Sequence, residues 1–154
     1  MMSLCCDVIQ TLRGKTLVTA ESLTGGGIGA ALTAVSGASA VYKGGIISYT
    51  NEVKHRLLGV PEETLHQYGA VSEPVAKAMA EGARKALEAD IAVSVTGLAG
   101  PTGDAFGNPV GTVFIGYSDS SKTAIIHSLF SGDRESIRNQ TIKAALNLVL
   151  TMQK

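Results

Sequence analysis

The stretch Thr16-Leu-Val-Thr-Ala-Glu-Ser-Leu-Thr-Gly-Gly-Gly27 joins a short β-branched, apolar run to three consecutive glycines. Residues 16–20 are typical of a buried strand. The Ala- and Leu-rich run at residues 28–35 predicts a helix after the glycines. A buried strand that passes through a tight turn into a helix is the repeating unit of α/β proteins.

Helices and strands are predicted to alternate along the rest of the chain. A first helix ends at Val8–Leu12 and is closed by Gly14, and a short helix opens with Pro61 at its first position. Ser72 and Asp133 are candidate caps of the two longest helices. The other predicted elements are strands at 45–49, 91–95, 111–117 and 123–130, and helices at 51–58, 73–88 and 133–152.

The connections between these elements predict the sheet. Helical segments separate the strands at 16–20, 45–49 and 91–95, which favours parallel neighbours. The last two strands are joined by the short turn Asp119–Lys122, which favours an antiparallel hairpin. The expected fold class is therefore α/β, a three-layer α/β/α sandwich with a mixed, mostly parallel sheet of about five strands.

Composition excludes several classes of protein. A length of 154 residues with 45% apolar residues predicts one globular domain over 1–154. Thirteen basic and 13 acidic residues leave no basic excess for nucleic acid or for an anionic membrane. No apolar run is long enough to span a bilayer, and the start lacks the basic region of a secretory signal.

Cysteine and histidine usage predicts a cytoplasmic protein without a metal. Cys5 and Cys6 are neighbours, which are poor disulfide partners, so a reducing compartment is expected. The histidines, His55, His66 and His127, are scattered and show no ligand spacing. We therefore expect no metal and no organic cofactor.

Ligands of open α/β sheets bind beyond the carboxyl ends of the strands, and three such ends carry unusual sequence. At the first, Ser22 lies on the glycine-rich turn, close to the N–H groups at the start of the next helix, where a nucleophile or an anion site is favoured. The alternative is a tight turn in which Ser or Thr merely caps the helix.

The second strand end leads to Lys54, about one turn into the helix at 51–58. From there the Lys54 side chain can reach back towards Ser22, and a lysine acts as a base where desolvation or a nearby cation lowers its pKa. Tyr49 can donate to the pair or orient it. The alternative makes Lys54 a solvated residue beside Glu52 and His55.

The third strand end is Ser94-Val-Thr-Gly-Leu-Ala-Gly-Pro-Thr-Gly103, the start of a turn-rich loop. Backbone N–H groups at 97–100, like those at 25–27, can form an oxyanion hole or hold a phosphate, although the segment can also be a plain connection. Arg134 and Arg138 are spaced four apart on one helical face, which suits either a phosphate or surface ion pairs.

Six segments, in order along the chain, resemble the C-terminal domain family of the competence/damage-inducible CinA proteins, in its standalone amidase form. The matching segments are Ala20–Gly26, Gly45–Lys54, Gly69–Pro74, Thr96–Pro101, Pro109–Val113 and Phe130–Arg134. The resemblance implies hydrolytic deamidation of nicotinamide mononucleotide to nicotinic acid mononucleotide in pyridine nucleotide salvage. It also implies a homodimer.

The resemblance further implies roles for particular residues. Ser22 would be the nucleophile and Lys54 its base, with Tyr49 nearby. The residues implied to bind the substrate are Thr24, Gly25, Gly26, Thr96, Gly97, Ala99, Gly100, Arg134 and Arg138.

Two other functions use the same residues. A non-catalytic nucleotide-binding module needs the glycine-rich loops and the arginines but no contact between Ser22 and Lys54. A nucleotide pyrophosphatase normally needs Mg²⁺ held by carboxylates, and no acidic cluster stands out in the sequence.

Overall fold

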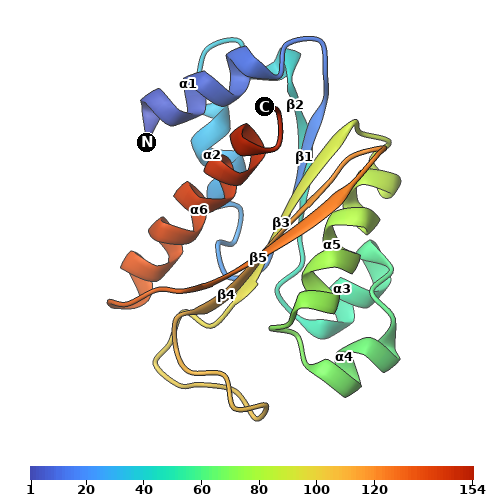
Figure 1. Ribbon diagram of the computed structural model, residues 1–154, viewed down its shortest axis with the longest axis vertical. Coiled ribbons are helices and arrows are strands. Elements are labelled where there is room, and N and C mark those ends of the chain that lie inside the picture. Colours follow the sequence, from blue (N-terminus) through green and yellow to red (C-terminus); the bar gives the residue numbers. More distant parts are fainter.

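A five-stranded sheet separates two layers of helices in the computed structural model, which describes residues 1–154 (Figure 1). The strands are β1 (Leu17–Glu21), β2 (Tyr42–Ile47), β3 (Ile91–Gly97), β4 (Thr112–Ser118) and β5 (Thr123–Leu129). The helices are α1 (Met2–Thr11), α2 (Gly27–Thr33), α3 (Asn51–Leu58), α4 (Glu62–Tyr68), α5 (Glu73–Ala86) and α6 (Arg134–Thr151), with a 3₁₀ turn η1 at Ala38–Ala40.

The strand order β2-β1-β3-β4-β5 confirms the predicted mixed sheet. β1 lies between β2 and β3 and is parallel to both, whereas β4 is antiparallel to both β3 and β5. Four of the five strands therefore run in the same direction. The predicted α/β/α fold class is confirmed.

Each face of the sheet buries its own apolar cluster. α1, α2 and α6 cover one face, and α3, α4 and α5 cover the other (Figure 1). α5 turns one face to the second cluster, because Val75, Met79 and Ala83, which are spaced four apart, are fully buried there.

β2 differs from its predicted position, because it begins at Tyr42 and ends before Ser48 and Tyr49. Glycine is depleted in strands, so Gly44 hides the start of the strand at residues 42–44. Gly44 has a positive φ of 154° and open space around it, whereas the role of Gly45 is steric. A Cβ on Gly45 would lie 2.3 Å from Oγ1 of Thr19 on the neighbouring strand, and that hydroxyl is 2.8 Å from the Tyr42 hydroxyl.

The helix starts follow the predictions in part. Asp133 precedes α6 and its side chain accepts a hydrogen bond from the Ser136 N–H, as a capping residue does. Ser72 precedes α5, but its hydroxyl donates to the Gly69 carbonyl and caps nothing. Pro61 lies just before α4 and not at its first helical position. None of the helices combines the length and the apolarity that a membrane crossing requires.

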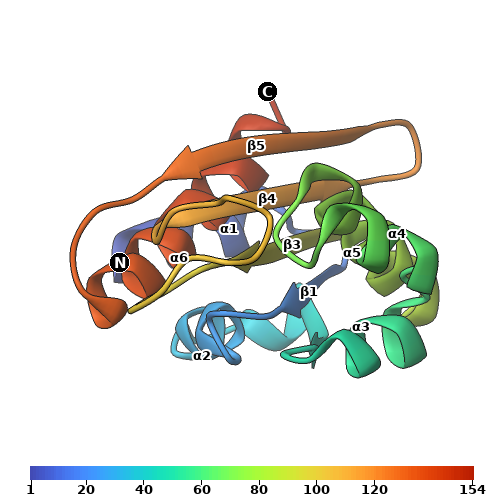
Figure 2. The same ribbon diagram turned by 90° about the horizontal axis from the view of Figure 1, so that it is seen from below.

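The carboxyl ends of β1, β2 and β3 meet at one end of the sheet, which points downward in Figure 1 and towards the reader in Figure 2. The turn into α2, the start of α3 and the loop at 98–111 gather around these ends. This is where the sequence predicts the functional residues.

Candidate active site

Ser22 and Lys54 are in direct contact. β1 ends at Glu21, so Ser22 is the first residue of the glycine-rich turn, and its N–H donates to the Val95 carbonyl of the neighbouring strand. Lys54 lies on the inner face of α3 and is 1% exposed. Its Nζ lies 3.0 Å from Ser22 Oγ.

The backbone that links β2 to α3 holds the Lys54 amine. Nζ also lies 2.8 Å from the Ser48 carbonyl oxygen and 3.1 Å from that of Tyr49. Carbonyl oxygens only accept hydrogen bonds, so two N–H bonds of a neutral amine are directed at them. The nitrogen lone pair of that amine is then left to accept the Ser22 hydroxyl proton.

Burial lowers the pKa of the Lys54 amine from its ordinary 10.5 to about 8. No carboxylate opposes this effect, because the two ion pairs of the structure, Arg56–Glu52 and His55–Glu62, do not include Lys54. A buried ammonium without an anionic partner is costly, so roughly a tenth to a quarter of Lys54 is neutral between about pH 7 and 7.5, far more than of an exposed lysine.

Glu21 is a buried residue of the site that the sequence analysis did not identify. Its side chain is 1% exposed and points into the start of α2. Its two carboxylate oxygens accept the N–H groups of Ile28 at 2.9 Å and Gly29 at 3.0 Å, and Oε1 also accepts the Thr24 hydroxyl. The anion site expected at the start of α2 is therefore occupied by a carboxylate of the chain itself.

The glycine-rich turn keeps several backbone N–H groups free. Gly25 N–H donates to the Ser22 carbonyl, and Gly27 N–H donates to the Thr24 carbonyl. The N–H groups of Leu23, Thr24 and Gly26 have no acceptor within the protein.

Arg134 joins two of the predicted segments at the surface. Its guanidinium donates to the Gly100 carbonyl oxygen at 2.6 Å and to the Tyr49 hydroxyl at 3.2 Å. The Tyr49 side chain is thus directed at Arg134, and only its backbone oxygen contacts Lys54. Both side chains are exposed and stand at the same end of the sheet as Ser22.

Arg138 is more enclosed and contacts the turn itself. Its Nε donates to the Leu23 carbonyl at 3.0 Å, and its Nη2 donates to the Thr24 carbonyl at 3.1 Å. One turn of α6 thus separates the exposed Arg134 from Arg138, which binds the backbone beside Ser22.

The remaining predicted residues lie around this centre, with their polar side chains already bonded. The Thr24 hydroxyl donates to Glu21, and the Thr96 hydroxyl donates to the Ala70 carbonyl at 2.8 Å. Gly25 and Gly26 have positive φ angles of 60° and 101°, which the tight turn requires. Gly97 ends β3. Ala99, which is buried, and Gly100, which is half-buried, follow it.

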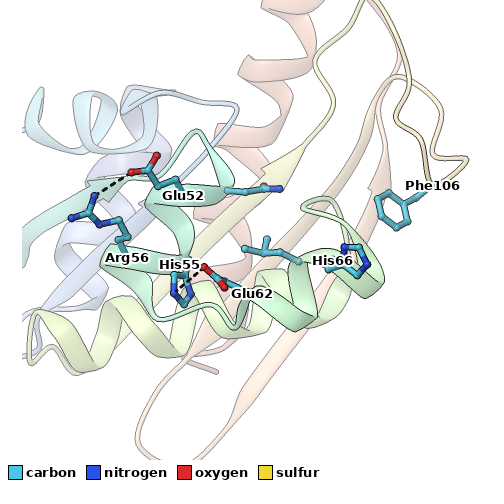
Figure 3. Close-up of a pocket in the computed structure, with 8 residues that line it drawn as sticks. Glu52, His55, Arg56, Glu62, His66 and Phe106 are labelled. Carbon is cyan, nitrogen blue, oxygen red and sulfur yellow. Dashed lines mark hydrogen bonds and ion pairs between the residues drawn. The ribbon is translucent and has the colours of Figure 1, made fainter.

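A surface pocket of about 520 Å³ lies on the outer side of α3 and α4, where the loop at 98–111 approaches them (Figure 3). None of the predicted site residues lines it. Glu52 and Arg56 pair along one wall, and His55 pairs with Glu62 (Figure 3). The full lining is Asn51, Glu52, His55, Arg56, Glu62, Leu65, His66 and Phe106. α3 therefore presents Lys54 to the buried site and its exposed polar face to this pocket.

The model of one protein family, the CinA C-terminal domain, matches residues 3–153. The chain belongs to the CinA C-terminal domain family. The resemblance of the six sequence segments is thus confirmed.

Relatives within the family differ in length. The nicotinamide-nucleotide amidohydrolase PncC of Escherichia coli K12 is 46% identical over 149 residues, which cover 95% of this chain and 90% of that protein. A CinA-like protein of Endomicrobium trichonymphae is 49% identical over 135 residues, 88% of this chain but 32% of that protein. The chain spans about a third of the length of such longer relatives.

Crystal structures of family members have the same fold. A CinA superfamily protein from Escherichia coli matches with a TM-score of 0.96 at 33% identity, over 98% of this chain and 89% of that one. The competence/damage-inducible protein of Agrobacterium tumefaciens matches with a TM-score of 0.96 at 37% identity, over 99% of this chain and 95% of that one.

Proposed function

We propose that this family member is an amidohydrolase that converts nicotinamide mononucleotide and water into nicotinic acid mononucleotide and ammonia, with Ser22 as nucleophile and Lys54 as base. The PncC relative supports this activity, because it is similar over nearly the whole of both chains. The reaction belongs to pyridine nucleotide salvage.

The observation that carries the proposal is the contact of 3.0 Å between Lys54 Nζ and Ser22 Oγ. A nucleophile and its base must lie within hydrogen-bond distance, and the base must be deprotonated at working pH. Lys54 lies within that distance, and its lowered pKa leaves part of it neutral near pH 7.

The reaction follows from these two groups. Neutral Lys54 takes the Ser22 proton as Oγ attacks the amide carbon, and a tetrahedral oxyanion forms. Collapse of this intermediate breaks the C–N bond, and Lys54 returns the proton so that ammonia leaves and Ser22 carries an ester. Lys54 then deprotonates water, which attacks the ester carbon. The ester C–O bond breaks, and Lys54 returns the proton to Ser22 Oγ as the acid product leaves. No metal or organic cofactor enters these steps.

Charged groups around the pair suit a nucleotide substrate. Arg134 is exposed at the mouth of the site, and we assign it to the phosphate, which would replace its contacts with Gly100 and Tyr49. The pyridinium ring carries a positive charge, which would lower the pKa of Lys54 further when substrate is bound.

The burial of Lys54 argues against a non-catalytic nucleotide-binding module. Such a module gains nothing from an amine that is 1% exposed and unpaired with any carboxylate. Groups held with strongly shifted pKa values are concentrated at catalytic sites. Three features remain predictions: that residues 1–154 form a single amidohydrolase domain, that the protein is a homodimer and that it is cytoplasmic.

Ammonia release from a panel of amides tests the proposal. The purified chain should release ammonia from nicotinamide mononucleotide faster than from free nicotinamide, glutamine or asparagine. Lys54→Arg should be nearly inactive, because guanidinium keeps its proton throughout the accessible pH range. Lys77→Arg, a matched change at an exposed lysine of α5, should keep wild-type turnover. Absence of ammonia from every nucleotide amide, or a fully active Lys54→Arg enzyme, would contradict the proposal.

A further inference from the structure

We propose that the backbone N–H groups of Leu23 and Thr24 form the oxyanion hole for Ser22, and that Arg138 and Glu21 are positioning residues which hold this turn from its two sides. The inference rests on the proposed amidohydrolase function. It assigns Arg138 to the turn instead of to the nucleotide.

The hydrogen bonds of the turn leave the N–H groups of Leu23, Thr24 and Gly26 free. Gly26 is the furthest of the three from Ser22 along the chain and is only half-buried, so Leu23 and Thr24 are the two candidates. Ser22's own N–H is taken by the Val95 carbonyl and Gly25 N–H by the Ser22 carbonyl, so neither is free for a ligand. Leu23 and Thr24 are the two residues directly after Ser22, and their N–H groups have no acceptor in the protein. In other serine hydrolases the residue after the nucleophile commonly supplies one donor of the oxyanion hole.

Both free donors belong to buried residues, so their lack of a partner indicates a role in binding a ligand. Leu23 is 4% exposed and Thr24 is 1% exposed, so water has little access to either backbone. Buried N–H groups are nearly always bonded, since an unsatisfied one costs free energy. Ala99 and Gly100 also carry free N–H groups, but they lie on a loop that follows another strand, whereas Leu23 and Thr24 are covalently tied to the nucleophile.

Arg138 acts on the same peptide group that carries the Thr24 N–H. That N–H and the Leu23 carbonyl belong to one planar peptide unit, and Arg138 Nε donates to this carbonyl. A guanidinium on the carbonyl oxygen fixes the orientation of the unit, and it polarises the unit so that the N–H becomes a stronger donor. The second bond, to the Thr24 carbonyl, fixes the next unit of the turn.

Glu21 holds the turn from the side of α2. Its carboxylate binds the N–H groups of Ile28 and Gly29 together with the Thr24 hydroxyl, so it ties residue 24 to the start of the helix. Glu21 and Arg138 thus both fix Thr24, through its hydroxyl and through its backbone carbonyl. Donors fixed before the reaction begins lower the barrier because nothing has to reorganise as charge develops.

Matched variants of the two arginines of α6 separate positioning of the turn from binding of the phosphate. For Arg138→Met we expect kcat on nicotinamide mononucleotide to fall by about tenfold or more, since loosening or losing one oxyanion donor costs this much. The Kd of the nucleotide, measured by calorimetry in a Ser22→Ala background, should stay within about twofold of its value without the change. Arg134→Met should do the opposite, weakening the Kd with a smaller change in kcat.

A thioamide substrate reports on the oxyanion hole itself. Sulfur is a poorer hydrogen-bond acceptor than oxygen, so wild type should prefer nicotinamide mononucleotide over thionicotinamide mononucleotide. This preference should shrink in Arg138→Met and recover in part in Arg138→Lys, which keeps one donor. A role of Arg138 in stability alone would lower the melting temperature and leave the preference unchanged.

The outcomes are distinguishable. A weakened Kd for Arg138→Met with unchanged kcat, or an unchanged preference for the oxygen substrate, would overturn the inference while leaving the amidohydrolase function intact. A wild-type protein without ammonia release would instead refute the proposed function. Should Arg138→Met fail to fold, kcat, the Kd of the nucleotide and the preference for the oxygen substrate can be measured in Arg138→Lys instead.

Discussion

Replacing Lys54 by Met removes the buried amine at nearly constant size, and its effect on stability can be calculated from the pKa. The folded-state pKa of Lys54 is about 8, against 10.5 when exposed. Between these values the unfolded chain binds more protons than the folded one, so the free energy of unfolding rises with pH. Stability contributed by neutral Lys54 is complete above pH 10.5 and is lost as pH falls through 8.

The expected size of this effect follows from the same two pKa values. From pH 7 to about pH 9.5, wild type should gain about 2 kcal/mol in unfolding free energy relative to Lys54→Met. All other titrating groups are common to both proteins, so their contributions cancel in the difference. Urea unfolding of both proteins at the two pH values measures it.

If the unfolding free energies of wild type and Lys54→Met changed with pH in parallel, Lys54 would not be a buried, neutral amine in the folded state. A difference that changes by less than about 0.5 kcal/mol between the two pH values would mean that Lys54 is charged or solvated in the folded state. The activity of wild type gives an independent check. kcat/KM should rise with pH through a group that titrates near 8 and then level off.

Three further substitutions and one dialysis experiment test the nucleophile, the packing of the fold and the metal-free reaction. Ser22→Ala should lower turnover by about 10³-fold or more while thermal unfolding stays close to wild type, whereas the exposed Ser120→Ala should leave ammonia release unchanged. Gly45→Ala should destabilise the fold by about 1–3 kcal/mol in urea unfolding, because the new Cβ meets Thr19 Oγ1 on β1; a neutral result would mean that β1 and β2 are not packed so closely. Asp133→Ala should cost about 1 kcal/mol through loss of its cap on α6, and an unchanged unfolding midpoint would exclude that contribution. Dialysis against a chelator should leave turnover intact, and activity lost by chelation and restored by one divalent ion would reverse the assignment of a metal-free reaction.

The sequence alone is enough to predict the buried strands, the buried helix face and the parallel strand order. The apolar runs at β1 and β3 and the spacing of four along α5 identify buried elements, and the helices between the strands predict their parallel order. The strand begins before its predicted position because Gly44 is a poor strand former. Only the neighbouring Thr19 and Tyr42 side chains, which need the space, explain Gly45.

The sequence also predicts the candidate site only in part, because some of its contacts join residues that are distant along the chain. The spacing after β2 is enough to expect Lys54 near Ser22, because the carboxyl ends of parallel strands share one edge of the sheet. The role of Glu21 cannot be read from its position in the motif, since its partners are N–H groups seven and eight residues later. The different environments of Arg134 and Arg138 are likewise set by which loops pack beside α6.

Mass spectrometry of the Ser22 peptide, after acid quench during turnover of nicotinamide mononucleotide, tests whether Ser22 is the nucleophile. We expect an added mass equal to the nicotinic acid mononucleotide acyl group, located on Ser22 and absent in Ser22→Ala. The adduct should form as the first ammonia is released, because the C–N bond breaks before water attacks the ester. An acyl adduct on another residue, or ammonia release by Ser22→Ala at the wild-type rate, would contradict covalent catalysis by Ser22.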